Sequence, residues 1–180
     1  MEKTISLARK LKKPSKEATD EHGNTELCIA CRDGHFEDAE VLIKLGADVR
    51  AKCLHQQTPL HFVAKHGNVK IAQLLIQNGA DVNVDADYEW TPLHEAASKG
   101  QLEVAKLLVK NGADVHAMNW FKEGPLHIAA GVGHPEIVKL LLKHGANKDL
   151  INIFKRTPLE EAEINKYGDF SNVEALLKQN

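Results

Sequence analysis

The sequence has few aromatic residues, few cysteines and no long hydrophobic run. Phe, Trp and Tyr make up 5% of the 180 residues, nine side chains in all. No apolar segment approaches the roughly 18 residues of a membrane-spanning helix, and the first residues lack the apolar core of a secretory signal. Three cysteines are an odd number and too few for a disulfide framework, which favours a reducing, intracellular compartment.

Motifs of catalysis are missing as well. The sequence contains no nucleophile elbow, no phosphate-binding glycine loop and no zinc-protease motif. Cys28 and Cys31 form a Cys-x-x-Cys pair, but no second pair exists to complete a tetrahedral metal site, so we interpret both as core residues. We therefore expect no enzyme activity, no cofactor and no metal; a hidden enzyme or metal protein is the alternative that metal analysis would test.

What the sequence does contain is a repeat. The motif Thr-Pro-Leu-His, or a variant of it, begins at residues 25, 58, 91, 124 and 157, a period of 33 without a slip. The Thr suits a helix N-cap and the Pro suits the first helical position. Apolar residues at helical spacing follow, so each unit predicts a helix, a turn, a second helix and an extended loop. One unit cannot bury its apolar face alone, so we expect the units to stack.

The period and its motifs closely resemble the ankyrin repeat family over about residues 20–180. The resemblance implies an all-α solenoid of stacked helix-turn-helix units with protruding hairpin loops. Its register divides the chain into an N-terminal capping segment, four repeats and a C-terminal capping repeat: 1–24, 25–57, 58–90, 91–123, 124–156 and 157–180. We interpret the last repeat as a cap because about three extra residues fall near 165–172 and acidic residues make its first helix polar.

The N-terminal segment is basic although the chain as a whole has a net charge of −2. Ile5, Ala8 and Leu11 could form one face of a helix that ends at Pro14, which predicts a half-repeat that caps the stack. The alternative is a basic amphipathic helix that attaches the chain to a membrane surface or to an import receptor. Disorder is the third interpretation.

The resemblance also implies roles for single residues. In the ankyrin family, the histidine of the motif hydrogen-bonds between neighbouring loops and helices, so we expect structural roles for His61, His94 and His127. The pattern Leu-x5-Asp-Val-Asn that ends at Asn83 resembles the site at which an oxygen-sensing hydroxylase modifies ankyrin asparagines. Asn83 is therefore a candidate modification site.

The aromatic residues gather where the family has its finger tips. In ankyrin proteins, the loop before each motif forms a hairpin finger, and the tips and inner helices make a concave face that binds other proteins. Both tryptophans and three further rings occupy tip positions of the last three fingers. Exposed aromatic patches usually mark interfaces, although the rings could instead pack together and stiffen the fingers. We predict these protein-binding residues: Tyr88, Trp90, Trp120, Phe121, Phe154, Arg156, Leu54, Lys65, Lys99 and Asp87.

These features together predict a non-catalytic protein-binding module that masks or scaffolds its partner. We expect a monomer whose partner is a protein or peptide with an exposed apolar patch and some basic groups opposite the acidic third finger. We expect no nucleic acid, no membrane, and a place in the cytoplasm or nucleus. The alternatives are a targeting or structural ankyrin protein that uses the basic N-terminal helix, or a pathogen effector that binds a host protein in the host cytoplasm.

Overall fold

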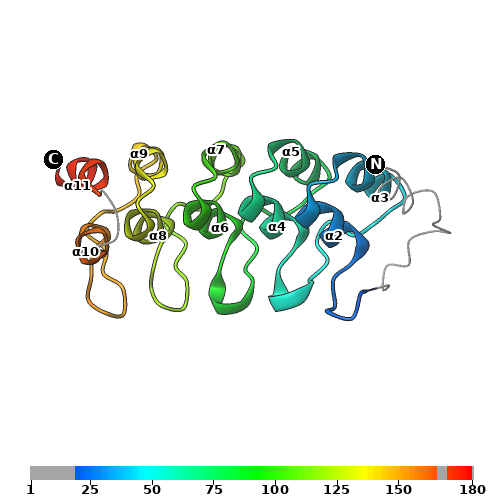
Figure 1. The fold of residues 1–180 in the computed structure, drawn as a ribbon, viewed down its shortest axis with the longest axis horizontal. Helices are drawn as coiled ribbons and strands as arrows, with labels where there is room; N and C mark the ends of the chain where they lie inside the picture. Colours follow the sequence, from blue (N-terminus) through cyan, green and yellow to red (C-terminus); the bar gives the residue numbers. More distant parts are fainter. Residues whose placement is uncertain (1–18, 166–169, 180) are drawn as a thin grey trace.

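The computed structural model describes residues 19–165 and 170–179, which form a row of paired helices (Figure 1). The first helix of each pair lies in an inner row: α2 (Glu26–Asp33), α4 (Pro59–His66), α6 (Pro92–Lys99), α8 (Pro125–Val132) and α10 (Pro158–Ile164). The second helix lies in an outer row: α3 (Phe36–Lys44), α5 (Val69–Gln77), α7 (Leu102–Lys110), α9 (Pro135–Lys143) and α11 (Ser171–Lys178). The predicted all-α solenoid is confirmed.

The inner helices begin and end where the repeat motif predicts. In α6, the Thr91 hydroxyl oxygen accepts a hydrogen bond from the backbone N–H of His94 at 3.4 Å, and proline occupies the first turn. Helix α4 ends at Gly67, whose φ of +81° lies in the left-handed region. A Cβ atom on Gly67 would also collide with the side chain of Gln101 in the next repeat. Glycine is favoured there by the left-handed turn, whereas the flexible end of the Gln101 side chain can move away from a Cβ atom.

The core runs between the two rows of helices and repeats with the sequence. Fully buried side chains recur every 33 residues, as in the inner set Ala64, Ala97 and Ala130 and the outer set Leu75, Leu108 and Leu141. The alanines allow adjacent inner helices to pack closely, and the leucines fill the space between each helix and its neighbours. Each repeat contributes an apolar face of the same kind, and that face becomes buried only when repeats stack on one another.

A disulfide joins Cys28 of α2 to Cys53, which lies in the loop before α4. This pair is not predicted from the sequence, because Cys53 lies 25 residues away on a loop that only the stacking of repeats brings next to α2. Cys28 is buried in the core as expected. Cys31 is a free, fully buried thiol, and burial raises its pKa.

The two ends of the chain differ from the middle. In the last repeat, α11 begins three residues later in the register than α9 does in the preceding repeat, as the predicted insertion requires. The proposed capping or targeting helix within residues 1–16 lies outside the described residues. Within residues 19–165 and 170–179, no helix combines the length and the apolar character that a membrane crossing needs.

Candidate protein-binding surface

The hairpin fingers before α4, α6, α8 and α10 project from the inner row of helices on one side of the molecule (Figure 1). We number them two to five and define them as residues 53–57, 86–90, 119–123 and 152–156. Each is closed at its base by a backbone hydrogen bond from its first residue to the carbonyl of its last, at 2.7–3.0 Å. Fingers two and three contain the short 3-10 turns η1 (Leu54–Gln56) and η2 (Asp87–Glu89). The fingers therefore repeat the same local geometry along the stack.

Two buried asparagines organise fingers four and five. The side-chain oxygen of Asn119 accepts hydrogen bonds from the backbone N–H groups of Phe121 (2.8 Å) and Glu123 (2.9 Å). Asn152 does the same for residues 154 and 156. Each tip contains a non-glycine residue with positive φ, Lys122 or Lys155. This backbone conformation is strained and persists only where surrounding contacts hold it. These asparagines are not identified as turn residues from the sequence. The pattern that could have identified them is their spacing of 33 residues inside loops that otherwise vary.

Three motif histidines connect the inner helices α4, α6 and α8 to the finger that follows or to the loop just before it. His61 Nδ1 accepts the backbone N–H of Thr58 (3.1 Å), so its Nε2–H donates to the carbonyl oxygen of Trp90 (2.9 Å). His94 Nε2 contacts the carbonyl oxygen of Glu123 in the same way, whereas His127 Nε2 contacts that of Leu150, two residues before finger five, each at 3.0 Å. We call these contacts histidine bridges. Burial lowers the pKa of His61 and of His94 to about 4, which keeps both rings neutral at pH 7.

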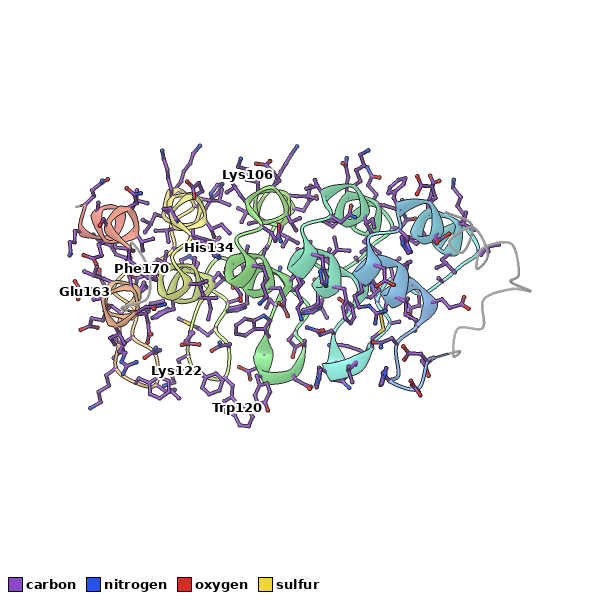
Figure 2. All side chains as sticks on the ribbon, viewed as in Figure 1. Lys106, Trp120, Lys122, His134, Glu163 and Phe170 are labelled. Atoms are coloured by element: carbon purple, nitrogen blue, oxygen red, sulfur yellow. A yellow bond between two sulfur atoms is a disulfide. The ribbon has the colours of Figure 1, made fainter. Side chains whose placement is uncertain are left out.

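Three aromatic side chains from fingers three and four lie against one another at the tips. The ring of Tyr88 stacks on Trp120 with centroids 5.6 Å apart and lies 6.3 Å from the ring of Phe121. Exposed fractions are 58% for Tyr88, 68% for Trp120 and 41% for Phe121. We call this group the aromatic stack. Trp120 lies at the far end of its finger, on the opposite side of the molecule from Lys106 of α7 (Figure 2).

The fingers that carry the aromatic stack are also joined through their backbones. The N–H of Trp120 donates to the carbonyl of Tyr88 at 2.9 Å, and the N–H of Ile153 donates to the carbonyl of Phe121 at 3.0 Å. Phe154 on finger five is 57% exposed, and the guanidinium of Arg156 lies 5.5 Å from its ring centroid. Fingers three to five therefore present one continuous apolar edge.

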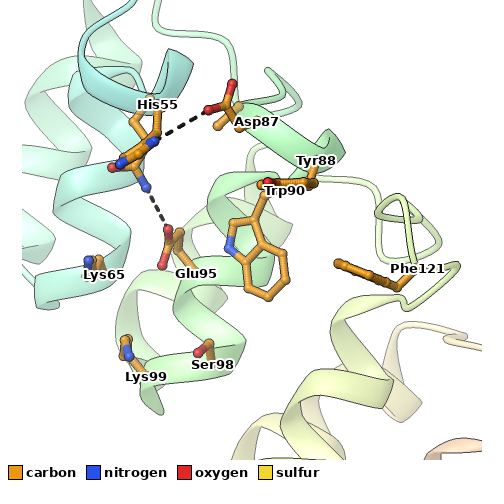
Figure 3. Close-up of a pocket in the computed structure, with 11 residues that line it drawn as sticks. His55, Lys65, Asp87, Tyr88, Trp90, Glu95, Ser98, Lys99 and Phe121 are labelled. Atoms are coloured by element: carbon orange, nitrogen blue, oxygen red, sulfur yellow. Dashed lines mark hydrogen bonds and ion pairs between the residues drawn. The ribbon is translucent and has the colours of Figure 1, made fainter.

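Trp90 lies apart from the stack and faces a groove of about 420 Å³ between fingers two to four and the inner helices α4 and α6 (Figure 3). Its ring packs 5.3 Å from that of His94. The wall and the floor of the groove are formed by Tyr88, Trp90, Phe121, Lys65, Glu95 and Lys99. The groove thus brings both predicted lysines together with three of the five predicted aromatic residues.

Glu95 is an acidic residue of the groove that sequence reasoning missed. It occupies an inner-helix position where neighbouring repeats have Phe62 and Ile128, and this break in an apolar column was the signal. Burial raises the pKa of its carboxyl, while Lys65 and Lys99 act in the opposite direction. Its Oε1 accepts a hydrogen bond from Gln57 Nε2 at 2.8 Å. The indole nitrogen of Trp90 faces Glu95 (Figure 3), and its proximity partly offsets the burial that raises the pKa of the Glu95 carboxyl. The nitrogen makes no hydrogen bond of good geometry.

The remaining predicted residues lie around the groove or away from it. Leu54 is 42% exposed on finger two, and Asp87 pairs with His55 at 3.5 Å. Asn83 links two outer loops, since its side chain donates to the carbonyl of Gly112 (2.9 Å) and accepts the N–H of Asp114 (2.8 Å). Among the residues that the structure describes, no cluster of His, Cys, Asp or Glu could hold a metal ion.

A scan against protein-family models matches the model described as ankyrin repeats (3 copies) at residues 27–119 and 116–180. A comparison with curated proteins finds no match. The matched residues cover most of the chain, and they contain α3 to α11, all of α2 except its first residue, the four fingers and the histidine bridges described above. Ankyrin repeats are in general protein–protein interaction modules and are typically non-catalytic. The chain belongs to the ankyrin repeat family.

Proposed function

We propose that this chain binds a partner protein, without catalysis, through its concave face and the tips of fingers three to five. The aromatic stack is the observation that carries the proposal. Tyr88 and Trp120 leave more than half of their side chains exposed, although exposed aromatic surface is unfavourable in water. Stacking and the backbone bonds between fingers hold these rings in place before a partner arrives, which reduces the entropy lost on binding.

The properties of the finger tips indicate the kind of partner. Ile153 and Phe154 extend the exposed apolar edge from finger four to finger five, so the partner should offer a complementary apolar patch. Occupancy is the simplest mechanism for such a stack of repeats: the module covers a partner's surface or bridges two partners. The intracellular location, the monomeric state and the absence of nucleic-acid ligands stay predictions.

The proposal is tested by replacing the two most exposed rings of the stack. Quantitative pull-down with the wild type and with a Tyr88→Ala, Trp120→Ala variant identifies partners that depend on the stack, and calorimetry then measures their affinity. Truncation of a central aromatic anchor typically costs about 2 kcal/mol or more, so we expect a loss of about 30-fold or greater. Unchanged affinity in a variant with normal helicity would refute the proposal.

A matched control removes exposed apolar side chains away from the fingers. Leu45 and Ile164 are 45% and 49% exposed, and neither belongs to fingers two to five. The Leu45→Ala, Ile164→Ala variant should bind the same partners with the affinity of the wild type. An equal loss in both double variants would indicate general hydrophobic adhesion instead of a defined site.

A further inference from the structure

The floor of the groove carries two lysines that have no carboxylate partner among the described residues. Lys65 of α4 and Lys99 of α6 both line it, and neither lies within ion-pair distance of Asp or Glu. Glu95 and Asp87 line the same groove: the Glu95 carboxylate is influenced by the charge of both lysines but accepts its hydrogen bond from Gln57, and Asp87 lies 3.5 Å from His55. Both lysine ammonium groups therefore keep hydrogen-bond donors that a ligand can use.

The charge of the floor restricts what can fill the groove. A basic segment would be repelled by the two lysines. A purely apolar segment would remove solvent from both ammonium groups and leave them only the carboxylate of Glu95, which is held by Gln57, as a counter-charge, and this is unfavourable. A carboxylate replaces that solvent with charge-assisted hydrogen bonds. The wall beside the lysines is aromatic, formed by Trp90 and Phe121, and suits an apolar side chain.

We propose that the groove binds an extended acidic segment of the partner protein, with an Asp or Glu side chain between Lys65 and Lys99 and an adjacent apolar side chain against Trp90 and Phe121. The proposal rests on the proposed function, because it specifies the chemistry of a partner bound at the concave face. It also changes the expected charge of the partner. Asp87 of the third finger lies 3.5 Å from His55, and Asp85, just before that finger, pairs with Lys52, so these acids make a weaker case for basic groups on the partner.

A phage-displayed library of random 12-residue peptides, selected on the full chain, provides the probe. We expect enriched peptides to contain Asp or Glu next to an aromatic or large aliphatic residue. Affinity of one synthetic consensus peptide is then measured by fluorescence anisotropy at two salt concentrations. Replacing its acid by the amide should weaken binding at least about tenfold, and higher salt should weaken the acidic peptide more than its amide analogue.

Variants of the chain separate this proposal from the proposed function. Lys65→Glu with Lys99→Glu should weaken the acidic peptide at least about tenfold, whereas Lys70→Glu with Lys110→Glu, the same charge change on outer helices α5 and α7, should leave it within about twofold. Peptides that need Tyr88 and Trp120 but not the two lysines would overturn the acidic-segment proposal and leave the proposed function intact. Peptides that need neither would overturn both. Lysine-dependent binding of a single-stranded oligonucleotide in place of peptides would also overturn this proposal.

In the first repeat, Cys28 stands at the position of the motif histidine. In the following repeats, the histidine bridges tie α4 and α6 to the next finger and α8 to the loop just before finger five. In the first repeat, the disulfide from Cys28 to Cys53 ties α2 to the base of finger two. Cys53 N–H donates to the carbonyl of Gln57, the position that corresponds to Trp90 in the His61 bridge. The covalent bond thus occupies the place of the missing histidine bridge.

We infer that the Cys28–Cys53 pair is a redox modification site that controls how firmly the first repeat is attached to finger two. The oxidant is a low-molecular-weight disulfide of the glutathione class. The thiolate of Cys53, which is 6% exposed, attacks one sulfur of that disulfide and releases one small thiol. The thiolate of Cys28 then displaces the second small thiol and closes the protein disulfide. Two protein thiols are oxidised, and one small disulfide is reduced to two thiols that take up both protons.

Hydrogen exchange followed by mass spectrometry tests this inference on the full chain in glutathione buffers of defined oxidised-to-reduced ratio. Reduction, or a Cys53→Ser substitution, should accelerate exchange in residues 26–33 and 53–57 by about tenfold or more, because the cross-link no longer restricts local opening. Exchange in α6 to α9 should stay unchanged. Cys31→Ser, which keeps the pair, should still respond to reduction.

A second variant replaces the disulfide by a histidine bridge of the kind that His61 makes. Cys28→His with Cys53→Ala copies the arrangement of His61 and Ala86, so it should restore slow exchange in residues 26–33 and make it insensitive to reductant. Equal exchange of α2 in oxidised and reduced wild type would overturn the inference. So would alkylation of all three cysteines in the denatured chain after equilibration with excess oxidised glutathione.

Discussion

The histidines of the repeat motif show how a single polar side chain can be both buried and fully used. His61 and His94 have no exposed surface, yet each ring accepts a hydrogen bond at Nδ1 and contacts the next finger through Nε2. Such an arrangement requires the neutral tautomer with the proton on Nε2. The bridges therefore depend on a protonation state that burial maintains.

Acidification should destabilise the chain because of these histidines. Their pKa is about 4 in the folded state and about 6.5 when unfolded, so the unfolded state binds more protons between these values. The free energy of unfolding should be constant above about pH 7 and fall as the pH drops from 6.5 toward 4, by on the order of 3 kcal/mol for each histidine. Urea unfolding at pH 7.5, 6.0 and 5.0 measures it.

A control for the acid effect is His22, whose side chain is 63% exposed. His22→Gln should keep the pH dependence of the wild type, whereas His94→Asn should remove about half of the loss assigned to the two histidines and leave the part that belongs to His61. Equal stability of the wild type at pH 7.5 and pH 5.0 would contradict the assignment of neutral bridges.

Gly124 gives a second prediction at the residue scale. It occupies the N-cap of α8, where the motif otherwise has threonine, and its φ of −85° suits any residue. A Cβ there would meet neighbouring atoms no closer than 3.6 Å. Gly124→Thr should therefore raise the free energy of unfolding by about 0.5 kcal/mol, through a side-chain cap and a less flexible unfolded chain. Denaturant melts of the variant and of Gly145→Thr, at φ +84°, would separate this gain from the strain expected at a left-handed glycine.

At the scale of elements, the fingers are ordered by side chains at their bases and by bonds between neighbours. Asn119 and Asn152 hold the turns of fingers four and five, and backbone bonds connect fingers three, four and five. Within the described part of the chain, no equivalent backbone bond joins fingers two and three. The aromatic edge therefore lies on the three fingers that are most firmly connected.

Replacing Asn119 should loosen finger four without removing any exposed side chain of the proposed binding surface. Asn119→Ala leaves the N–H groups of Phe121 and Glu123 without their acceptor, which should lower the free energy of unfolding by about 1–3 kcal/mol. Exchange of those two amides, followed by NMR, should accelerate. Asn111→Ala removes an exposed asparagine with one side-chain bond and serves as the matched control. Unaltered exchange at residues 121 and 123 would show that the turn does not need Asn119.

At the scale of the whole molecule, each repeat depends on its neighbours for burial. The terminal repeat covers the preceding one: Phe170 packs over Gly133 and, with Val173 and Leu177, is nearly fully buried. Its exposed side is polar, where Lys178 of α11 pairs with Glu163 of α10 and with Glu174. This composition is typical of an end cap that faces water on one side.

Deletion of residues 157–180 should therefore expose the apolar face of α8 and α9. The loss of burial for Phe170, Val173, Leu177 and their contacts corresponds to roughly 3 kcal/mol or more. We expect a lower urea midpoint and increased binding of a hydrophobic dye, while deletion of residues 179–180 alone should have little effect. A truncated chain with the midpoint of the full chain would mean that the last repeat adds no stability.

The sequence by itself determined the fold of this protein, because the exact period of 33 fixes the local structure and the contacts between neighbours together. It also located the fingers, the histidine bridges and the late start of α11. These features follow from residues within one repeat or in adjacent copies, so a register is sufficient to place them.

Only the tertiary structure decided how side chains from different repeats meet. It stacks Tyr88 on Trp120, turns Trp90 into the groove, and joins Cys28 to Cys53. It also surrounds Glu95 with Gln57, Lys65 and Lys99 from two inner helices and a finger. A repeat register fixes the position of a residue along the chain, but the rotamers, burial and electrostatic surroundings of these side chains depend on three-dimensional packing across neighbouring repeats.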